Sequence, residues 1–397
     1  MSTNMGPLSG IRVLDLGRHL SCPSCGMTLG DMGAEVIKVE KRGYGDETRH
    51  EGQKVKGQSI YYLTENRNKK GITIDFRSEE GKELLRELIK KSDVLIENFR
   101  FGTMAKMGFD WETVHKLNPR LIMASISGYG EGSPYKERPG FDTIMSATSG
   151  VMYLNRAKEG PRITGGIWYA DIMAGMWATI GILAALNKRN ITGEGQYIDI
   201  AMYDACISAL NTYIPTYDQI RSVPEDPSKY VYACPSGQFR SKDGWVVCLA
   251  GIDSLFERLL TITDDPFLHK PEFRNLEARI APENYDLINE ATGRLMQTKT
   301  GDEWDEIFAE VGIPGGKIKD IGDVLDCPAT YARNTTVKID IPDLGPVIFA
   351  GTPLNFSDEK LEFVRPPELG EHNREVYGEI LGLSDEEISE LEAKKII

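Results

Sequence analysis

The 397-residue sequence lacks the signatures of several common protein classes. Its six cysteines are few and scattered, which is typical of reduced thiols rather than of a disulfide scaffold. Its five histidines form neither an HExxH motif nor a short ligand pair, and no GxSxG motif occurs. No GxGxxG motif follows the first predicted strand, which argues against NAD binding. We therefore expect no permanently bound cofactor and no metal.

Positive charge and long apolar runs are also scarce. With 46 Lys and Arg against 60 Asp and Glu, the net charge is -14 and the pI is near 5.0. Nucleic-acid binders and proteins that adhere to anionic membranes usually present a basic face, so neither partner is expected. The longest near-apolar run, 172–186, falls short of the roughly 20 residues that span a bilayer. The N-terminal stretch has no signal-peptide pattern, and a cytoplasmic location is expected.

The first 200 residues alternate between strand and helix patterns. Strands are predicted at 11–16, 34–40 and 71–76, and within "SDVLIENF" and "RLIMASISGYG". Ser78 is placed to cap a helix whose apolar stripe contains Leu84, Leu85, Leu88 and Ile89. This alternation predicts an α/β fold: a Rossmann-like large domain with a mostly parallel sheet covered by helices.

A change of character after residue 213 predicts a second domain. We expect residues 1–213 to form the large domain, 214–232 a Pro- and Tyr-rich linker, and 233–330 a smaller α+β domain. The small domain contains the hairpin pattern "GQFRSKDGWVVCLAG" followed by helical patterns. Residues 331–397 are predicted to return to the large domain.

The most apolar segment, "GGIWYADIMAGMWATIGILAAL" (165–186), contains a single charged residue, Asp171. An Asp at a helix N-terminus is routinely a cap, which is one interpretation. The other is a reactive carboxylate, because apolar neighbours raise a carboxyl pKa while the positive helix end lowers it. Gly165 and Gly166 would let the backbone approach a substrate closely. Such a carboxylate suits nucleophilic catalysis.

Basic residues gather just after the predicted strands. They are Lys41, Arg42, the "NRNKK" stretch at 66–70, Arg77, Arg100, Lys106, Lys136 and Arg138. A solvated rim is one interpretation of such a set. The other is a site for a polyanionic ligand, because open α/β sheets bind ligands at the carboxyl ends of their strands.

Several longer motifs together resemble the class III coenzyme A transferase family. They are "GDMGAEVIKVEKRGYGDETR", "NRNKKGITIDF", "SDVLIENFRFGTMAKMGF", "NPRLIMASISGYGEGSPYKERPGFD" and "ADIMAGMWATIGILAAL". The family includes formyl-CoA, carnitine and bile-acid CoA-transferases and the related α-methylacyl-CoA racemases. The resemblance runs from residue 8 to about 205 and continues more weakly through "KDGWVV" and "GTPLNFS".

The resemblance implies a CoA-transferase that forms an interlocked homodimer. Its catalytic aspartate falls on Asp171, which would carry CoA from an acyl-CoA donor to a free carboxylate through mixed-anhydride and aspartyl-CoA thioester intermediates. Residues that the resemblance places near CoA are His19, Lys41, Ile74, Arg77, Asn98, Phe99, Lys106 and Met107. Residues expected near the substrate or its oxyanion are Asp142, Gly165, Gly166, Gly237 and Gln238.

Two departures from the family pattern bear on the reaction. Racemases of the family carry His before the Asp of the "GFD" element, whereas Phe141 precedes Asp142 here. Formyl-CoA transferases carry a run of glycines where this chain has "CPSGQ", with a single glycine. A racemase that uses Asp142 and Asp171 remains the main alternative. An NAD-dependent enzyme and a non-catalytic CoA-binding protein are the others.

Overall fold

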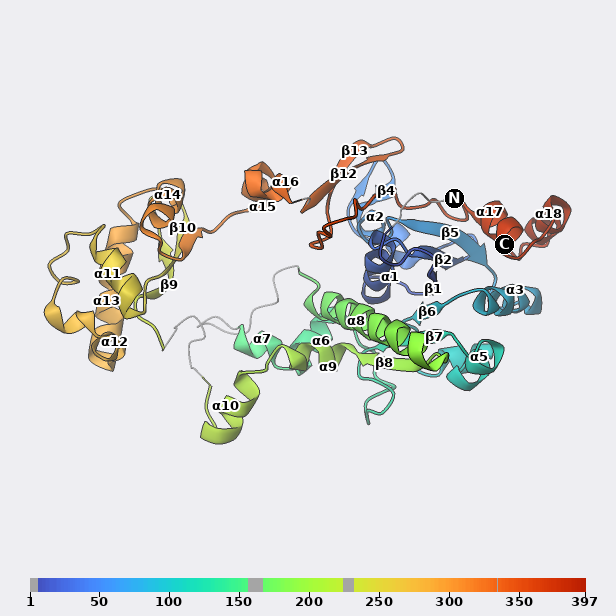
Figure 1. The fold of residues 1–397 in the computed structure, drawn as a ribbon, viewed down its shortest axis with the longest axis horizontal. Helices are drawn as coiled ribbons and strands as arrows, with labels where there is room; N and C mark the ends of the chain where they lie inside the picture. Colours follow the sequence, from blue (N-terminus) through green and yellow to red (C-terminus); the bar gives the residue numbers. More distant parts are fainter. Residues whose placement is uncertain (1–5, 156–166, 224–231, 334) are drawn as a thin grey trace. The chain divides into compact units, whose positions relative to one another are not determined.

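The computed structural model describes residues 6–155, 167–223, 232–333 and 335–397, and two compact units are found in it (Figure 1). The first unit contains the described residues up to Tyr153, those from Ile167 to Pro215 and those from Ala329 to the C-terminus. The second is built mainly from the described residues between Thr216 and Pro328, so it is inserted into the chain of the first.

A six-stranded parallel sheet forms the centre of the first unit. Its strands are β1 (Arg12–Asp15), β2 (Glu35–Lys41), β5 (Lys69–Ile74), β6 (Val94–Glu97), β7 (Ile122–Ser127) and β8 (Tyr197–Ala201). The spatial order is β5-β2-β1-β6-β7-β8, with every neighbouring pair parallel. In chain order this is 3-2-1-4-5-6, the doubly wound arrangement, which reverses direction between β1 and β6. The predicted α/β fold with a parallel sheet is confirmed.

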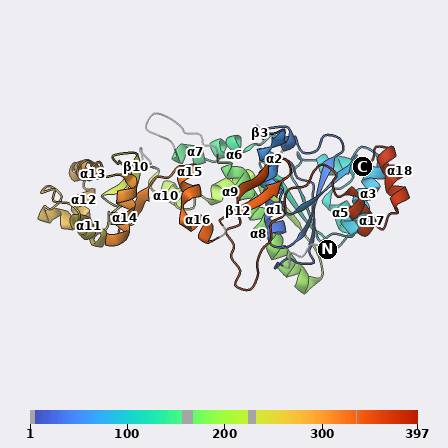
Figure 2. The same ribbon diagram turned by 90° about the horizontal axis from the view of Figure 1, so that it is seen from above.

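Helices cover both faces of this sheet (Figures 1 and 2). On one face lie α1 (Ser21–Asp31), α8 (Tyr169–Thr192) and α9 (Met202–Ser208), whose apolar residues share one core cluster. On the other face lie α3 (Glu79–Lys90), α5 (Trp111–Leu117), α17 (Asn373–Glu379) and α18 (Asp385–Ala393), which share a second cluster. The Ser78 side chain caps α3 as predicted, because its hydroxyl accepts a hydrogen bond from Gly81 N–H.

Helix α8 is longer than the sequence pattern indicated. The apolar run ends at residue 186, but the helix extends over Tyr169–Thr192, 24 residues. The polar last turns remain helical because Arg189 is 5% exposed and pairs with Asp93 at 3.0 Å. By length and composition this helix could also span a membrane, a test that buried helices of ordinary cores pass as well. Its buried residues pack against the first core cluster.

The first unit also contains shorter elements. They are β3 (Lys54–Val55), β4 (Gln58–Ser59), α2 (Ile60–Glu65), α4 (Thr103–Met107), α6 (Asp142–Thr148) and the hairpin β12 (Thr336–Ile341) and β13 (Gly345–Ala350). The hairpin packs its apolar face on α2 through Ile339, Phe349 and Leu63. The C-terminal segment therefore supports the helix that follows β4.

The second unit has its own antiparallel sheet and core. The sheet order is β11-β10-β9, with β9 (Ser236–Arg240), β10 (Trp245–Leu249) and β11 (Gly315–Lys317). Its main helices are α11 (Asp253–Leu260), α13 (Pro282–Met296) and α14 (Gly301–Val311). Buried Phe256, Trp304 and Phe308 belong to the core between them. Helix α10 (Tyr213–Ile220) lies at the start of the stretch predicted as a linker.

Candidate active site

Asp171 lies in the first turn of α8, but another residue caps that helix. Backbone N–H groups of Ala170 and Asp171 donate to Asp142 Oδ1 at 2.6 and 3.3 Å. Asp142 begins α6 and is 4% exposed. A carboxylate at a helix N-terminus satisfies backbone donors that have no partner within the helix. Because Asp142 does this for α8, the interpretation of Asp171 as the routine cap of its own helix is wrong.

The Asp171 carboxylate instead faces the N-terminus of α1. Ser21, the first residue of α1, lies next to it, and the Ser21 hydroxyl and backbone lower the pKa of Asp171 against the effect of burial. Leu20 stands at the N-cap position of α1, and its apolar side chain cannot satisfy the free donors there. Asp171 therefore provides the negative charge that the positive end of α1 favours.

Close packing of α8 on α1 makes this contact possible. Gly175 lies one turn after Asp171, at the point where the two helices meet. A Cβ atom at Gly175 would lie 2.3 Å from Ser24 Oγ and 2.7 Å from the Ser21 carbonyl oxygen. Only a residue without a side chain allows this approach, so Gly175 sets the distance between Asp171 and Ser21.

The surroundings of Asp171 raise its pKa from 3.8 to about 7. Burial is the largest cause, and the nearby carboxylates of Asp142 and Glu65 add to it. The two hydrogen bonds from Ser21 oppose the rise. A carboxylate with such a pKa is only partly ionised at neutral pH and is more basic than a free one. Strong perturbation of this kind is typical of functional groups.

Aromatic side chains flank the carboxylate. Tyr61 of α2 stacks on Trp168, with ring centroids 6.1 Å apart. His19 and Phe141 meet edge to face at 5.8 Å. Burial, with the charge of Asp171 next in importance, raises the pKa of the Tyr61 hydroxyl, which therefore keeps its proton at neutral pH.

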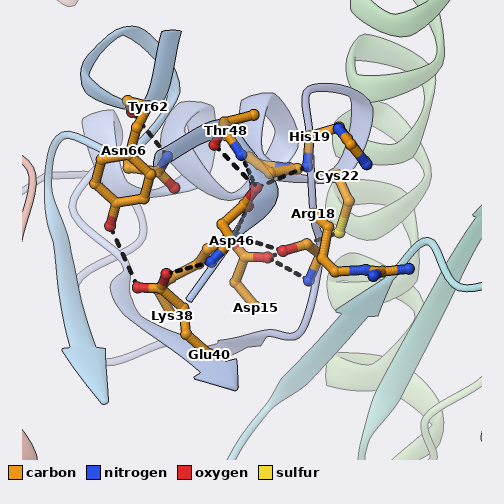
Figure 3. A network of polar contacts seen from close by, with 12 residues as sticks. Asp15, Arg18, His19, Cys22, Lys38, Glu40, Asp46, Thr48, Tyr62 and Asn66 are labelled. Carbon is orange, nitrogen blue, oxygen red and sulfur yellow. Dashed lines mark hydrogen bonds and ion pairs between the residues drawn. The ribbon is translucent and has the colours of Figure 1, made fainter. Parts of the chain in front are cut away.

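A buried ion pair holds the loop between β1 and α1 (Figure 3). Lys38 of β2 is fully buried and donates to Asp46 Oδ2 at 2.9 Å and to the carbonyl oxygen of Gly17. The other Asp46 oxygen accepts from His19 N–H at 3.2 Å. Burial opposes ionisation, but Lys38 and hydrogen bonds from Thr48 lower the pKa of Asp46 to about 2. The pair fixes His19 in a left-handed conformation, with φ of 59°, that non-glycine residues rarely adopt.

Asn98 holds the same loop from the opposite side. It follows β6, across the switch point from β1. Its Oδ1 accepts from Arg18 N–H at 2.8 Å, and its Nδ2 donates to the Arg18 carbonyl at 2.7 Å and to Ser21 Oγ at 3.3 Å. Both ends of the amide are thus engaged with the segment that leads to Ser21.

A cavity of about 560 Å³ and a smaller one of about 220 Å³ open near the carboxyl edge of the sheet. The smaller one lies beside the β1–α1 loop and is lined by Arg18, Lys41, Phe76 and Phe99, among others. The larger one lies beyond β6, β7 and β8, and Phe99 lines it as well. Phe99 therefore stands between two hollows on the ligand-binding edge of the fold.

The other residues expected near CoA are more dispersed. Ile74 is fully buried at the end of β5, and the exposed Arg77 follows it. On α4, Lys106 is exposed and Met107 packs partly against the second core cluster. All of them come after the carboxyl ends of strands in the first unit, on the edge where the loop of His19 also lies.

Part of the expected basic surface is structural instead. Arg67 is 3% exposed and pairs with Asp31 at 2.6 Å, and Lys69 is 4% exposed and pairs with Asp15 at 2.7 Å. Within "NRNKK", therefore, two of the three charges that a ligand was expected to meet are neutralised inside the fold. The sequence shows the charges but not the carboxylates that the sheet brings beside them.

The remaining predicted residues lie apart or outside the described structure. Gly165 and Gly166 lie outside the described residues. Gly237 and Gln238 lie on β9 of the second unit, which is described separately from the Asp171 site. Ser21, Tyr61, Lys38 and Asp46 were missed by sequence reasoning. The only signal for Ser21 was its position just before a helical pattern, where Ser is common in any protein.

The chain matches the model of CoA-transferase family III over residues 8–373. It is 37% identical to the succinyl-CoA–L-malate CoA-transferase beta subunit of Chloroflexus aurantiacus, covering 100% of this chain and 99% of that one. It is 31% identical to the human succinyl-CoA:glutarate CoA-transferase, covering 98% and 89%. It is 33% identical to the acetyl-CoA:oxalate CoA-transferase of Acetobacter aceti, covering 92% and 94%.

A solved structure supports the same assignment. The crystal structure of a CAIB/BAIF family protein from Brucella suis superposes with a TM-score of 0.83 at 34% identity, covering 95% of this chain and 100% of that one. Its likeness extends over nearly the whole chain, as does the match to the family model. The chain therefore belongs to CoA-transferase family III and is a CoA-transferase.

Proposed function

We propose that Asp171 is the nucleophile that moves CoA from an acyl-CoA donor to a free carboxylate, with succinyl-CoA as the first donor to test. The observation that carries the proposal is the Asp171 carboxylate, which is half-buried, has a raised pKa and is not needed to cap its own helix. Relatives that act on succinyl-CoA with L-malate, D-citramalate or glutarate support the choice of donor.

The first half of the reaction needs no proton transfer. An Asp171 oxygen attacks the thioester carbonyl carbon, a C–O bond forms, and the C–S electron pair leaves with CoA thiolate. The thiolate then attacks Cγ of Asp171 in the mixed anhydride, a C–S bond forms, and the donor acid leaves as a carboxylate. The second half reverses this order with the acceptor carboxylate. Every intermediate stays activated, provided that water is kept out.

The raised pKa of Asp171 affects how the mixed anhydride breaks down. In the mixed anhydride the thiolate can attack either carbonyl carbon. Attack on the donor carbon expels Asp171, whose pKa is about 7. Attack on the Asp171 carbon expels an ordinary carboxylate, whose pKa is about 4. The weaker base is the better leaving group, which favours aspartyl-CoA in the first half of the reaction and opposes the release of Asp171 in the second half.

We assign CoA to the edge of the sheet near β1, β2, β5 and β6. Lys41, Arg77 and Lys106 are cations suited to the ribose phosphate and the diphosphate of CoA. Phe99 and Met107 offer apolar contact, the buried Ile74 can take part only through its backbone, and His19 lies on the path toward Asp171. The support for this arrangement is that these residues follow strand ends in a doubly wound sheet.

The geometry disfavours the racemase alternative. Proton exchange at the α-carbon of an acyl-CoA needs two groups that can exchange protons with the substrate. One Asp142 oxygen already accepts two N–H groups of α8, and the residue is almost fully buried. Phe141 occupies the position of the racemase histidine and cannot take up a proton. Transfer is therefore the reaction that the site supports best.

We also propose that the enzyme is the interlocked homodimer implied by the family. Three large apolar residues of α8, namely Met176, Trp177 and Ile180, are 54%, 44% and 50% exposed in the single chain. Apolar side chains clustered on one helix usually mark an interface. A second copy of this chain is the proposed partner, and insertion of the second unit within the first provides the chain crossings that linkage requires.

The proposal is tested by trapping the intermediate. The enzyme is incubated with succinyl-CoA without acceptor, treated with hydroxylamine, and mapped by peptide mass spectrometry. Modification at Asp171 is expected, and Asp171→Asn should abolish both the modification and CoA transfer to L-malate, glutarate or oxalate. Near-normal transfer by Asp171→Asn, in protein that has not deamidated back to Asp, would refute the assignment.

A further inference from the structure

We infer that Arg18 binds the diphosphate of CoA and that Glu47 competes with CoA for the Arg18 guanidinium. The inference rests on the proposed function, because it takes the CoA site to lie at the sheet edge near β1 and β2. It adds Arg18 to the cations that meet CoA, and it makes Glu47 the residue that limits how tightly CoA is held.

Asp46 holds the main chains from which the two side chains extend. Arg18 follows β1, and Glu47 begins the short helix η1 (Glu47–Arg49). Asp46 accepts from the backbone N–H of His19 at 3.2 Å and from that of Thr48 at 3.0 Å (Figure 3). These two residues come directly after Arg18 and Glu47, so both main chains are fixed and a change of partner is confined to the side chains.

The ion pair between Arg18 and Glu47 leaves one atom on each side without a partner. Arg18 Nη1 donates to Glu47 Oε1 at 2.6 Å. Arg18 Nε and Glu47 Oε2 are buried and have no hydrogen-bond partner among the residues that the structure describes. An arginine–carboxylate pair of full strength uses two parallel N–H···O bonds, as Arg49 and Glu40 do beside this site at 2.8 and 2.7 Å. The Arg18 pair is therefore incomplete, and each unsatisfied buried group costs free energy.

The same ion pair lines the cavity of about 220 Å³ beside the β1–α1 loop, and the other walls of that cavity suit a nucleotide. The Arg18 guanidinium lies over the ring of Phe99, 5.3 Å from its centroid, and the Lys41 ammonium lies over Tyr44 at 5.6 Å. Phe76 adds a further aromatic side chain to the lining. Aromatic rings on which a base can stack, beside two cations, match the chemistry of an adenine nucleotide with a diphosphate.

The charges that line this cavity favour an exchange of partners. Two acids of the lining, Asp46 and Glu40, are already neutralised by cations of their own. The other charged side chains of the lining are Arg18, Lys41 and Glu47, two cations and one anion. A diphosphate oxygen pair can accept from Nε–H and from an Nη–H of Arg18 in parallel. The exchange therefore gives Arg18 the second bond that Glu47 does not provide, and the partly exposed Glu47 carboxylate can turn to water.

Competition predicts that the two partners affect CoA binding in opposite directions, which calorimetric titration of the full chain with CoA can measure. Arg18→Gln should raise the Kd for CoA about 10- to 100-fold, the range for a lost hydrogen bond to a charged group. Arg18→Lys keeps the charge without the fork and should raise the Kd less than Arg18→Gln. Glu47→Gln should lower the Kd about two- to fivefold, because the guanidinium no longer leaves a charged, partly exposed partner.

Dephospho-CoA locates the contact within the ligand. It lacks the ribose phosphate but keeps the diphosphate, so Arg18→Gln should weaken dephospho-CoA by the same factor as CoA. A loss for CoA alone would place Arg18 at the ribose phosphate and overturn the assignment to the diphosphate.

The matched control is an ion pair of the same kind on α3. Arg86 pairs with Glu83 at 2.7 Å and lies 5.9 Å from the centroid of the Phe109 ring, but neither charged residue lines the cavity. Arg86→Gln and Glu83→Gln should leave the Kd for CoA unchanged. A change equal to that of the Arg18 or Glu47 variants would overturn the inference, because it would not depend on the cavity.

Glu51→Gln controls for a general loss of negative charge near the site. Glu51 is exposed and lies 3.8 Å from the ring of His19, and it has no part in the Arg18 pair. It should lower the Kd less than Glu47→Gln does. Equal effects of these two variants, or a higher Kd in Glu47→Gln, would overturn the competition, since the pair would then only hold the loop. Transfer by Asp171→Asn would refute the proposed nucleophile and leave these binding results unchanged, so the two failures can be told apart.

Discussion

Replacement of Asp171 by Asn should abolish transfer and, at the same time, remove a pH-dependent cost to folding. The folded state holds the Asp171 carboxyl with a pKa of about 7, against 3.8 for the ordinary group. Because this pKa is raised in the folded state, the protonated Asp171 carboxyl contributes its full stability below pH 3.8. This contribution is lost as the pH rises through 7. Asn does not titrate, so the variant lacks this dependence.

The expected magnitude follows from the pKa difference. Between pH 5.5 and pH 7, a span of about 1.5 pH units, the free energy of unfolding of the wild type should fall by about 1.4 kcal/mol per unit. The total loss is about 2 kcal/mol. Above pH 7 the difference should level off. For a domain of this size, the thermal midpoint of the wild type should fall relative to that of Asp171→Asn by on the order of 4 °C.

Thermal unfolding followed by circular dichroism at pH 5.5, 7 and 8 measures this difference. Asp204→Asn, which removes an exposed carboxylate from neighbouring α9, is the charge-matched control and should show no comparable trend. If the difference between Asp171→Asn and the wild type is flat with pH, or grows toward low pH, the buried, weakly acidic carboxyl that we describe does not exist in solution.

Three further outcomes are expected. Lys106→Ala should weaken CoA more than dephospho-CoA in calorimetric titrations if Lys106 meets the ribose phosphate; equal weakening would assign it to the diphosphate, and no effect would remove it from the site. Lys38→Met should lower the free energy of unfolding in urea by about 3–5 kcal/mol, because Asp46 is left buried without its partner, and a loss below 1 kcal/mol would contradict a tight ion pair. Analytical ultracentrifugation should give a mass near twice 44.3 kDa at every practical dilution, and a folded monomer would exclude interlocked chains.

The main elements of the fold could be predicted because their signals are local. Each central strand is a short apolar run, and the helix after Ser78 shows both a cap and an apolar stripe in the sequence. The end of α8 could not be predicted in the same way. Its last turns look polar and exposed, and they are helical because Arg189 reaches Asp93, which is 96 residues earlier in the chain.

For a similar reason, only part of the chemistry of the site could be predicted from the sequence. Asp171 is the only charged residue in an apolar run, and the family motif places the catalytic aspartate at the same position. No sequence pattern singles out Ser21, because its position beside Asp171 depends on the packing of α1 against α8 at Gly175. Arg67 and Lys69 show the opposite error, since their charges are visible but the carboxylates that neutralise them come from distant strands and helices.

Asp142 and Asp171 have different roles, which explains why a carboxylate lies at the start of the most apolar helix. A helix N-terminus demands a negative group, and Asp142 provides it for α8 from outside the helix. Asp171 can then turn toward α1, whose own N-terminus lacks a polar cap side chain at Leu20. The apolar length of α8 is what packs Asp171 against α1 and raises its pKa by burial. The same apolar helix thus creates the reactivity of the carboxylate and holds it against the N-terminus of α1.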